Sequence, residues 1–225
     1  MTRPVIIVSA GPGFDPKDYL TLHQKGDLCV LNYAHKGLAD NPELPVPKYF
    51  CCCDTAMNFK NDWYPNPNVI KLFAKKPDKR LDLKNERVTI CQQSTAWDED
   101  YFETTNKKGD PIPKRILYPF KTILFAVQYL HLFEGYQRLA FYGSPMTPNK
   151  YTDFSKYQQP WYGNAEDYKP ELRRYMGKCK NMDTMLYVLR QQSWYLKKHN
   201  YQWTSLTKDS ALNEFMHYSR IDLYD

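Results

Sequence analysis

The chain has 225 residues with a net charge of +6, and 42% of its residues are hydrophobic, so it is long enough to bury a substantial core. No apolar run reaches the roughly 20 residues that span a bilayer, and the first apolar stretch is too short for a secretory signal peptide. We therefore expect no membrane span and a cytoplasmic location, which is the host cytoplasm if the chain is viral.

The cysteine pattern favours a reduced protein without structural zinc. Three of the six cysteines, Cys51, Cys52 and Cys53, are adjacent. Side chains alternate in direction along an extended chain, so these three do not converge on one metal ion. Small apolar residues in a buried strand are the simpler interpretation. We therefore expect no metal site and no disulfide.

The surplus of positive charge is spread over short basic pairs, such as Lys107 with Lys108 and Arg173 with Arg174. Such pairs usually lie on a solvated surface. They also suit a polyanionic partner such as DNA, because proteins bind nucleic acids mainly by neutralising phosphates. Charge alone does not decide between these interpretations.

The beginning of the chain predicts a buried strand followed by a turn. Val5–Val8 is a continuous aliphatic run, which is typical of a strand buried on both faces of a parallel sheet. Small residues at 9–13 end this strand. Asp15 then precedes Pro16, and this pair suits the cap and first position of a short helix through Leu22.

Strands and helices alternate along the rest of the chain. Further strands are predicted at residues 28–31, 49–53, 88–91, 138–142 and 202–206. Helices are predicted at residues 69–74, 121–133 and 182–198, and Asp209 or Ser210 caps a last helix through about Tyr218. This alternation predicts an α/β fold with a single doubly wound, mostly parallel sheet of the Rossmann-like kind. We expect residues 1–225 to form one domain.

Polar or small residues follow almost every predicted strand. They are Gly11 and Gly13, Asn32, Asp54, residues 92–95, Gly143 with Ser144, and residues 208–210. In doubly wound sheets, ligands bind beyond the carboxyl ends of the strands. We therefore expect these residues to lie around one nucleotide site.

The residues at the first three of these strand ends suit the parts of a nucleotide. Gly11-Pro12-Gly13 matches neither a dinucleotide fingerprint nor a P-loop, but it allows backbone N–H groups to approach a phosphate. An ordinary tight turn has the same composition. Asn32 suits a base or ribose, and Asp54 suits ribose hydroxyls or a metal ion, with a strand-end cap as the alternative for each.

Two further segments have compositions that suit catalysis and substrate binding. The run of Asp98, Glu99 and Asp100 offers a general base, or else forms a solvated acidic loop. Residues 146–176 have no clear period, and loops of this length in compact domains are usually functional lids. Their aromatic side chains, Tyr162 among them, suit stacking on a sugar or an extruded base. We therefore expect an aromatic lid insertion at about 144–178.

Short motifs occur in one order along nearly the whole chain. VIIVSAGP at 5–12 is similar to a first strand with a Gly-Asn-Gly-Pro-Ser turn, and GYQRLAFYG at 135–143 to Gly-Tyr-Lys-Glu-Ile-Tyr-Leu-Ser-Gly. YMGKCKNMD at 175–183 is similar to the lid-end motif Tyr-Ile-Gly-His-Ser-Lys-Asn-Thr-Asp. Asn32 and Asp54 stand where the same family has Asn. Together these segments resemble the bacterial sialyltransferase-like glycosyltransferases of the cytidine-nucleotide-sugar type, with this chain as a divergent bacterial or phage member.

The resemblance implies a GT-A-like variant of the fold, with a nucleotide at the strand ends and a lid over the sugar. The family's catalytic base is the His of the lid-end motif, where this chain has Lys178. A protonated lysine accepts no proton, so Lys178 is expected to bind phosphate while Asp54 or Asp98 serves as the base. Ala10, Pro145 and Thr147 also depart from the family's residues, which favours a sugar other than sialic acid.

The predicted site has three groups of residues. Catalytic roles fall to Lys178, Asp54 and Asp98. Nucleotide binding falls to Gly11, Pro12, Gly13, Asn32, Asp54, Gly143 and Ser144. Contacts with the acceptor or with phosphate fall to Lys178, Lys180, Arg173, Arg174 and Tyr162.

The sequence thus predicts a glycosyltransferase with a cytidine or uridine nucleotide-sugar donor and no tightly bound cofactor; a divalent metal is compatible with it but not required. The acceptor is a hydroxyl, either on a hydroxymethylated base in DNA, as in phage DNA modification, or on a surface glycan. A non-catalytic nucleotide- or nucleic-acid-binding protein of the same fold is the second hypothesis, which Lys178 favours. Magnesium-dependent pyrophosphoryl transfer from ATP to a small heterocycle is the third.

Overall fold

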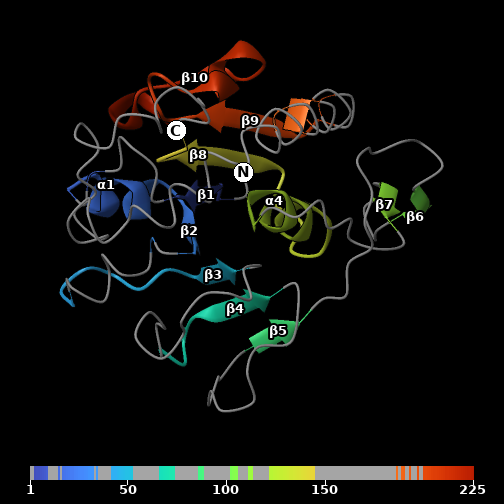
Figure 1. Ribbon diagram of the computed structural model, residues 1–225, viewed down its shortest axis with the longest axis horizontal. Coiled ribbons are helices and arrows are strands. Elements are labelled where there is room, and N and C mark those ends of the chain that lie inside the picture. The colour runs from blue at the N-terminus through green and yellow to red at the C-terminus, as the bar shows by residue number, and fades with distance from the viewer. Residues whose placement is uncertain are drawn as a thin grey trace, which may run out of the picture.

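The computed structural model describes residues 3–9, 15, 17–32, 34, 42–52, 66–73, 86–88, 102–105, 111–113, 122–144, 186, 189–190, 193, 197 and 200–225. Its main feature is an eight-stranded sheet in the order β10-β9-β8-β1-β2-β3-β4-β5 (Figure 1). The strands are β1 (Val5–Val8), β2 (Asp27–Leu31), β3 (Tyr49–Cys52), β4 (Ile70–Phe73), β5 (Glu86–Val88), β8 (Arg138–Tyr142), β9 (Gln202–Ser205) and β10 (His217–Tyr218). A separate two-stranded sheet pairs β6 (Phe102–Thr105) with β7 (Pro111–Pro113).

Every pair of neighbouring strands in the large sheet is parallel. The chain moves outward from β1 through β2 to β5, and then returns to place β8 on the other side of β1. The direction of winding therefore reverses between β1 and β8. This order confirms the predicted α/β class with a doubly wound, parallel sheet of the Rossmann-like kind.

Two apolar clusters bury the two faces of the sheet. Val5 and Ile7 pack with α4 (Thr122–Leu132), whereas Ile6 and Val8 pack with α1 (Asp18–Lys25). Figure 1 shows these helices on opposite sides of the central strands. Successive side chains of a strand point to opposite faces, and all four residues of β1 are at most 1% exposed. The aliphatic run of β1 thus serves both cores at once, as predicted for a strand buried on both faces.

Two predicted elements are wrong in type or length. The expected helix at 69–74 is strand β4, which pairs with β3 and β5. The last helix begins with the predicted Ser210 cap, whose hydroxyl accepts from the Leu212 N–H, but it is a short 3-10 helix, η4 (Ala211–Glu214). The chain then forms β10 and a second 3-10 helix, η5 (Ile221–Leu223), so the sheet gains a strand that the pattern did not predict.

Other expected elements differ mainly in their bounds. The first helix begins at Asp18 and ends at Lys25, rather than running from Asp15 to Leu22. The strand expected at 88–91 is described only over Glu86–Val88. Of the helix expected at 182–198, the five described residues are helical. The lid expected at 144–178 lies outside the described residues, except for Ser144.

His131 joins α4 to the edge of the sheet through two buried hydrogen bonds. The Trp203 indole N–H donates to His131 Nε2 at 2.5 Å, so the proton of the ring lies on Nδ1, which donates to the Tyr136 carbonyl at 2.5 Å. Burial lowers the pKa of His131 to about 3, because the charged ring would lose its hydration. This histidine is therefore a neutral part of the core.

The lowered pKa of His131 makes stability depend on pH. The unfolded chain takes up a proton below pH 6.5 while the folded chain does not, so stability falls as the pH drops below that value. We expect a loss of about 2 kcal/mol between pH 7.5 and pH 5 from this group. Urea unfolding of a His131→Gln variant should show a flatter pH dependence, and His217→Gln, at an exposed position on β10, should keep the original one. An unchanged slope in His131→Gln would contradict this assignment.

Candidate functional site

The carboxyl ends of β1 and β8 lie side by side where the winding reverses. Val8 pairs with Tyr142, and the N–H of Ser9 continues the ladder by donating to the Tyr142 carbonyl at 2.9 Å. Gly143 follows with a φ of 67°, which favours glycine and turns the chain directly after the strand. Ser9 and Ser144 are thus brought together at the position where doubly wound sheets bind ligands.

Hydroxyl groups from three strand ends meet at Ser144. Its hydroxyl donates to the Ser9 hydroxyl at 2.8 Å, and its backbone N–H donates to Thr207 Oγ1 at 3.3 Å. Its carbonyl accepts from the Ser210 hydroxyl at 2.6 Å. Ser144 is 2% exposed, whereas Ser9 is half-buried. We call Ser9, Ser144, Thr207 and Ser210 the hydroxyl cluster.

Asn32 lies at the same edge of the sheet, after β2. It has a φ of 45°, a conformation that asparagine tolerates better than most residues, and its N–H donates to the Cys51 carbonyl at 3.0 Å. Its side-chain oxygen accepts from the hydroxyl of Thr122, the first residue of α4, at 3.0 Å. The start of α4 therefore also lies at the carboxyl edge, and its first turn has no acidic residue.

The start of α1 is already occupied by acidic side chains. Asp15 accepts from the Lys17 N–H at 2.9 Å, and Asp18 accepts from the Tyr142 hydroxyl at 2.5 Å. Burial raises the pKa of Tyr142, and its hydrogen bond to Asp18 adds to that effect. The positive end of the α1 dipole stabilises these carboxylates, but their negative charges oppose the binding of an external anion there. An anion at this edge is therefore better accommodated near α4 and the hydroxyl cluster than at the first turn of α1.

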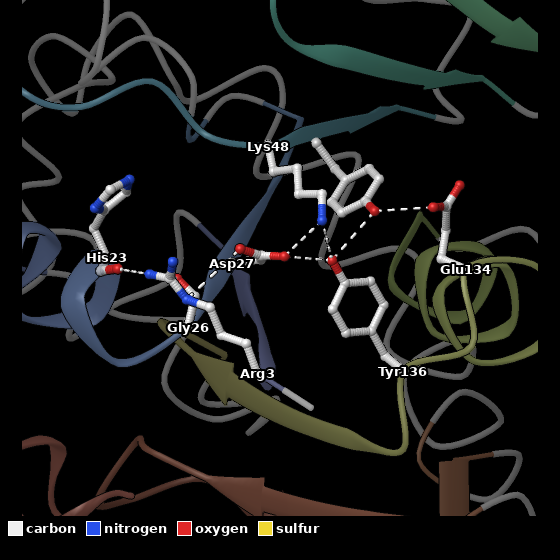
Figure 2. A network of polar contacts seen from close by, with 8 residues as sticks. Arg3, His23, Gly26, Asp27, Lys48, Glu134 and Tyr136 are labelled. Atoms are coloured by element: carbon white, nitrogen blue, oxygen red, sulfur yellow. Dashed lines mark hydrogen bonds and ion pairs between the residues drawn. The ribbon is translucent and has the colours of Figure 1, made fainter. Parts of the chain in front are cut away.

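The opposite, amino edge of the sheet carries a network of polar side chains that form hydrogen bonds and ion pairs with one another (Figure 2). The Asp27 carboxylate accepts from Lys48 at 2.7 Å and from the Tyr136 hydroxyl at 2.6 Å. Lys48 also donates to Tyr136 at 2.8 Å, and the Tyr49 hydroxyl donates to Glu134 at 3.0 Å. Arg3 lies 3.7 Å from Asp27 and donates to the Gly26 carbonyl. The network ties together the amino ends of β1, β2, β3 and β8.

Charges at the amino edge settle the protonation of this network. Burial works to raise the pKa of Asp27, but hydrogen bonds from Lys48 and Tyr136 and the charges of Lys48 and Arg3 outweigh it, so the pKa is lowered. Burial raises the pKa of Tyr136 and of Tyr49, which keeps both phenols protonated. Each of these groups is paired inside the network, which holds the amino ends of four strands together.

Three of the predicted site residues fall in the described part of the chain: Asn32, Gly143 and Ser144. All three lie at the carboxyl edge of the sheet. The others lie outside the described residues: Gly11, Pro12, Gly13, Asp54, Asp98, Tyr162, Arg173, Arg174, Lys178 and Lys180. Ser210 belongs to residues 208–210, which the sequence placed at this edge. Ser9 and Thr207 were not predicted, although small hydroxyl residues directly after strands were the signal that could have identified them.

The described residues include neither a cluster suited to a metal ion nor a helix suited to a bilayer. Among these residues, no group of three or more His, Cys, Asp or Glu side chains is placed to hold a metal ion. None of the helices in the described part of the chain is long and apolar enough to cross a bilayer. Cys29, Cys51 and Cys52 lie buried in β2 and β3, as predicted for small apolar residues of a strand.

The fold and the carboxyl-edge site define a doubly wound α/β protein with Rossmann-like topology. No protein-family model and no curated protein matches the sequence. Among solved structures, the chain is similar to the sialyltransferase CstII from Campylobacter jejuni, which was studied in complex with a substrate analogue, CMP-3FNeuAc. The two are 12% identical, the match covers 100% of this chain and 89% of the other, and the TM-score is 0.42.

Proposed function

We propose that the protein is a glycosyltransferase that binds a cytidine or uridine nucleotide sugar at the carboxyl edge of the sheet. The observation that carries this proposal is that Ser9, Asn32 and Ser144 follow the carboxyl ends of β1, β2 and β8, next to the reversal of winding, with Ser9 and Ser144 hydrogen-bonded to each other. Hydroxyl and amide groups suit the ribose, base and phosphates of a nucleotide. The motifs shared with sialyltransferase-like enzymes favour a sugar as the group that is transferred.

In the proposed reaction, the acceptor hydroxyl attacks the anomeric carbon of the donor sugar. A carbon–oxygen bond forms there as the bond between the sugar and the nucleotide phosphate breaks, and the phosphate keeps the electron pair. Asp54 takes the proton of the acceptor hydroxyl, with Asp98 as the alternative base. Lys178 stabilises the charge on the departing phosphate, and Lys180, Arg173, Arg174 and Tyr162 contact the acceptor or phosphate.

The acceptor that we favour is the hydroxyl of a hydroxymethylated base in DNA. The net charge of +6 and the basic pairs suit a polyanion. A hydroxyl of a surface glycan is the alternative acceptor. A binding protein of the same fold is the competing function, because a lysine at 178 stands where the related enzymes have their catalytic histidine.

Donor turnover tests the proposal. The protein is incubated with a panel of CMP-sugars and UDP-sugars, with and without hydroxymethylated DNA, and release of CMP or UDP is measured. We expect hydrolysis of one donor class, faster release when the right acceptor is present, and no loss of activity in EDTA. Asp54→Asn should lower turnover by a factor of about 100 or more, since a general base contributes at least that much. Tight DNA binding without turnover of any donor would show a binding protein instead.

A further inference from the structure

We propose that Ser9 donates a hydrogen bond to a phosphate oxygen of the bound nucleotide, and that Ser144 is the positioning residue that orients it. This inference rests on the proposed function and adds a role for two hydroxyls to it. Ser9 is the first residue after β1, at the reversal of winding. Ser9 lies within the motif at 5–12, but the nucleotide-binding residues predicted from the sequence do not include it.

Ser144 is held at each of its polar atoms. Its N–H donates to Thr207, its carbonyl accepts from Ser210, and its hydroxyl donates to Ser9. Ser210 is fixed in turn, because its hydroxyl also accepts from the Leu212 N–H at the start of η4. The backbone of Ser144 is therefore held on both sides, and from this position its hydroxyl donates to Ser9.

The direction of this hydrogen bond decides what Ser9 offers to a ligand. A serine hydroxyl has one proton to donate and two lone pairs that accept. Ser144 gives its proton to Ser9, so the Ser9 oxygen is the acceptor in that bond and keeps its own proton. Among the residues that the structure describes, none accepts that proton. Ser9 is half-buried, so part of this residue remains open to solvent.

An oxygen that only accepts hydrogen bonds is the best partner for this proton. Phosphate oxygens at neutral pH have no proton to donate, and hydrogen bonds to charged oxygens are stronger than those to neutral ones. The first turn of α1 does not supply this interaction, because Asp15 and Asp18 lie there. A neutral hydroxyl on the β1 side thus replaces the helix N-terminus that commonly binds phosphate in such folds.

Calorimetry with two pairs of ligands tests this inference. CMP and cytidine, and UMP and uridine, are titrated into the wild-type protein and into Ser9→Ala, Ser144→Ala and the double variant. We expect Ser9→Ala to weaken the binding of CMP or UMP, whichever binds, by about 10-fold, as for the loss of one charge-assisted hydrogen bond. The affinity for the corresponding nucleoside should change by less than about 2-fold. Ser144→Ala should weaken nucleotide binding by a smaller factor. The double variant should match Ser9→Ala, because Ser144 acts only through Ser9.

The outcomes separate this inference from the function on which it rests. Ser219→Ala, which removes a hydroxyl bonded to the Arg220 carbonyl after β10, is the matched control and should bind as the wild type does. Equal weakening of nucleotide and nucleoside, unchanged binding in Ser9→Ala, or additive losses in the double variant would each overturn the role of Ser9 while leaving the nucleotide site intact. A wild-type protein that binds none of the four ligands would overturn both proposals.

Discussion

Replacing Asp27 with alanine is expected to destabilise the protein by about 2–3 kcal/mol, because a buried hydroxyl and an ammonium then lose their shared acceptor. Asp27 is 19% exposed, and it accepts hydrogen bonds from the Tyr136 hydroxyl and from Lys48. The half-exposed Lys48 regains water after the change, so most of the loss comes from Tyr136. Urea unfolding at pH 7 measures the difference.

The same variant tests whether the amino edge of the sheet contributes to stability without contributing to nucleotide binding. Asp27 lies at the amino end of β2, so Asp27→Ala should leave nucleotide affinity unchanged under conditions where the protein is folded. Asp222→Ala is the matched control, since it breaks an exposed ion pair with Arg220 and should cost less than about 1 kcal/mol. Equal stability losses in the two variants would contradict a tightly coupled network at the amino edge.

Replacing Gly26 with alanine is expected to cost about 3 kcal/mol, because the added carbon meets a neighbouring strand. A Cβ at this position would lie 2.7 Å from the Pro4 carbonyl oxygen and 3.1 Å from Ile6 Cγ1. That carbonyl accepts from the Asp27 N–H at 2.9 Å. Relieving the clash therefore disturbs the first hydrogen bond between β1 and β2. Thermal and urea unfolding both report this loss.

Gly135 provides the control for this steric effect. Its φ is 76°, in the left-handed region, but a Cβ there would have no atom within 4 Å. Gly135→Ala should therefore cost about 1 kcal/mol, from backbone strain alone. Gly26 has a φ of −162°, which any residue adopts, so the stability loss in Gly26→Ala comes from the steric contact alone. If Gly135→Ala were the more damaging of the two, packing between β1 and β2 would be looser than described.

The central strands could be predicted because each is a compact apolar run with a clear end. Val5–Val8 and Arg138–Tyr142 match their predicted bounds, and α4 differs from its prediction by one residue at each end. These elements lie within the sheet or pack over it, so their apolar residues are the buried ones. Burial is the property that a pattern of hydrophobic residues predicts most directly.

β4 was mistaken for a helix because a short apolar run does not distinguish the two structures. This run also contains Lys71. In the fold this residue is fully buried, and its ammonium donates to the carbonyls of Asn66 and Val69 at 2.8 and 3.3 Å. Those bonds come from the turn that precedes the strand, and the pattern of hydrophobic residues does not report them.

The last helix was predicted to be too long for a related reason. Ser210 is a real cap, yet the helix it opens ends at Glu214. His217 and Tyr218 instead pair with Thr204 and Ser205 of β9, and this pairing depends on a neighbouring strand rather than on the local pattern. Capping signals predict where a helix begins, but competition with a sheet edge decides where it ends.

The candidate site was predictable in its position but not in its contacts. The rule that ligands bind beyond the carboxyl ends of parallel strands led to Asn32, Gly143 and Ser144. The partners of Ser144 come from segments that are 135, 63 and 66 residues away, so no local pattern links them. The amino-edge network was missed in the same way, because Asp27 and Tyr136 are 109 residues apart.

The location of the nucleotide site can be determined from a crystal structure with bound CMP or UMP. We expect the nucleotide beyond the carboxyl ends of β1, β2 and β8, with a phosphate oxygen within hydrogen-bond distance of Ser9 and the base or ribose near Asn32. A nucleotide bound at the amino edge, beside Lys48 and Tyr136, would rule out this site. So would crystals that hold no nucleotide at any concentration tested.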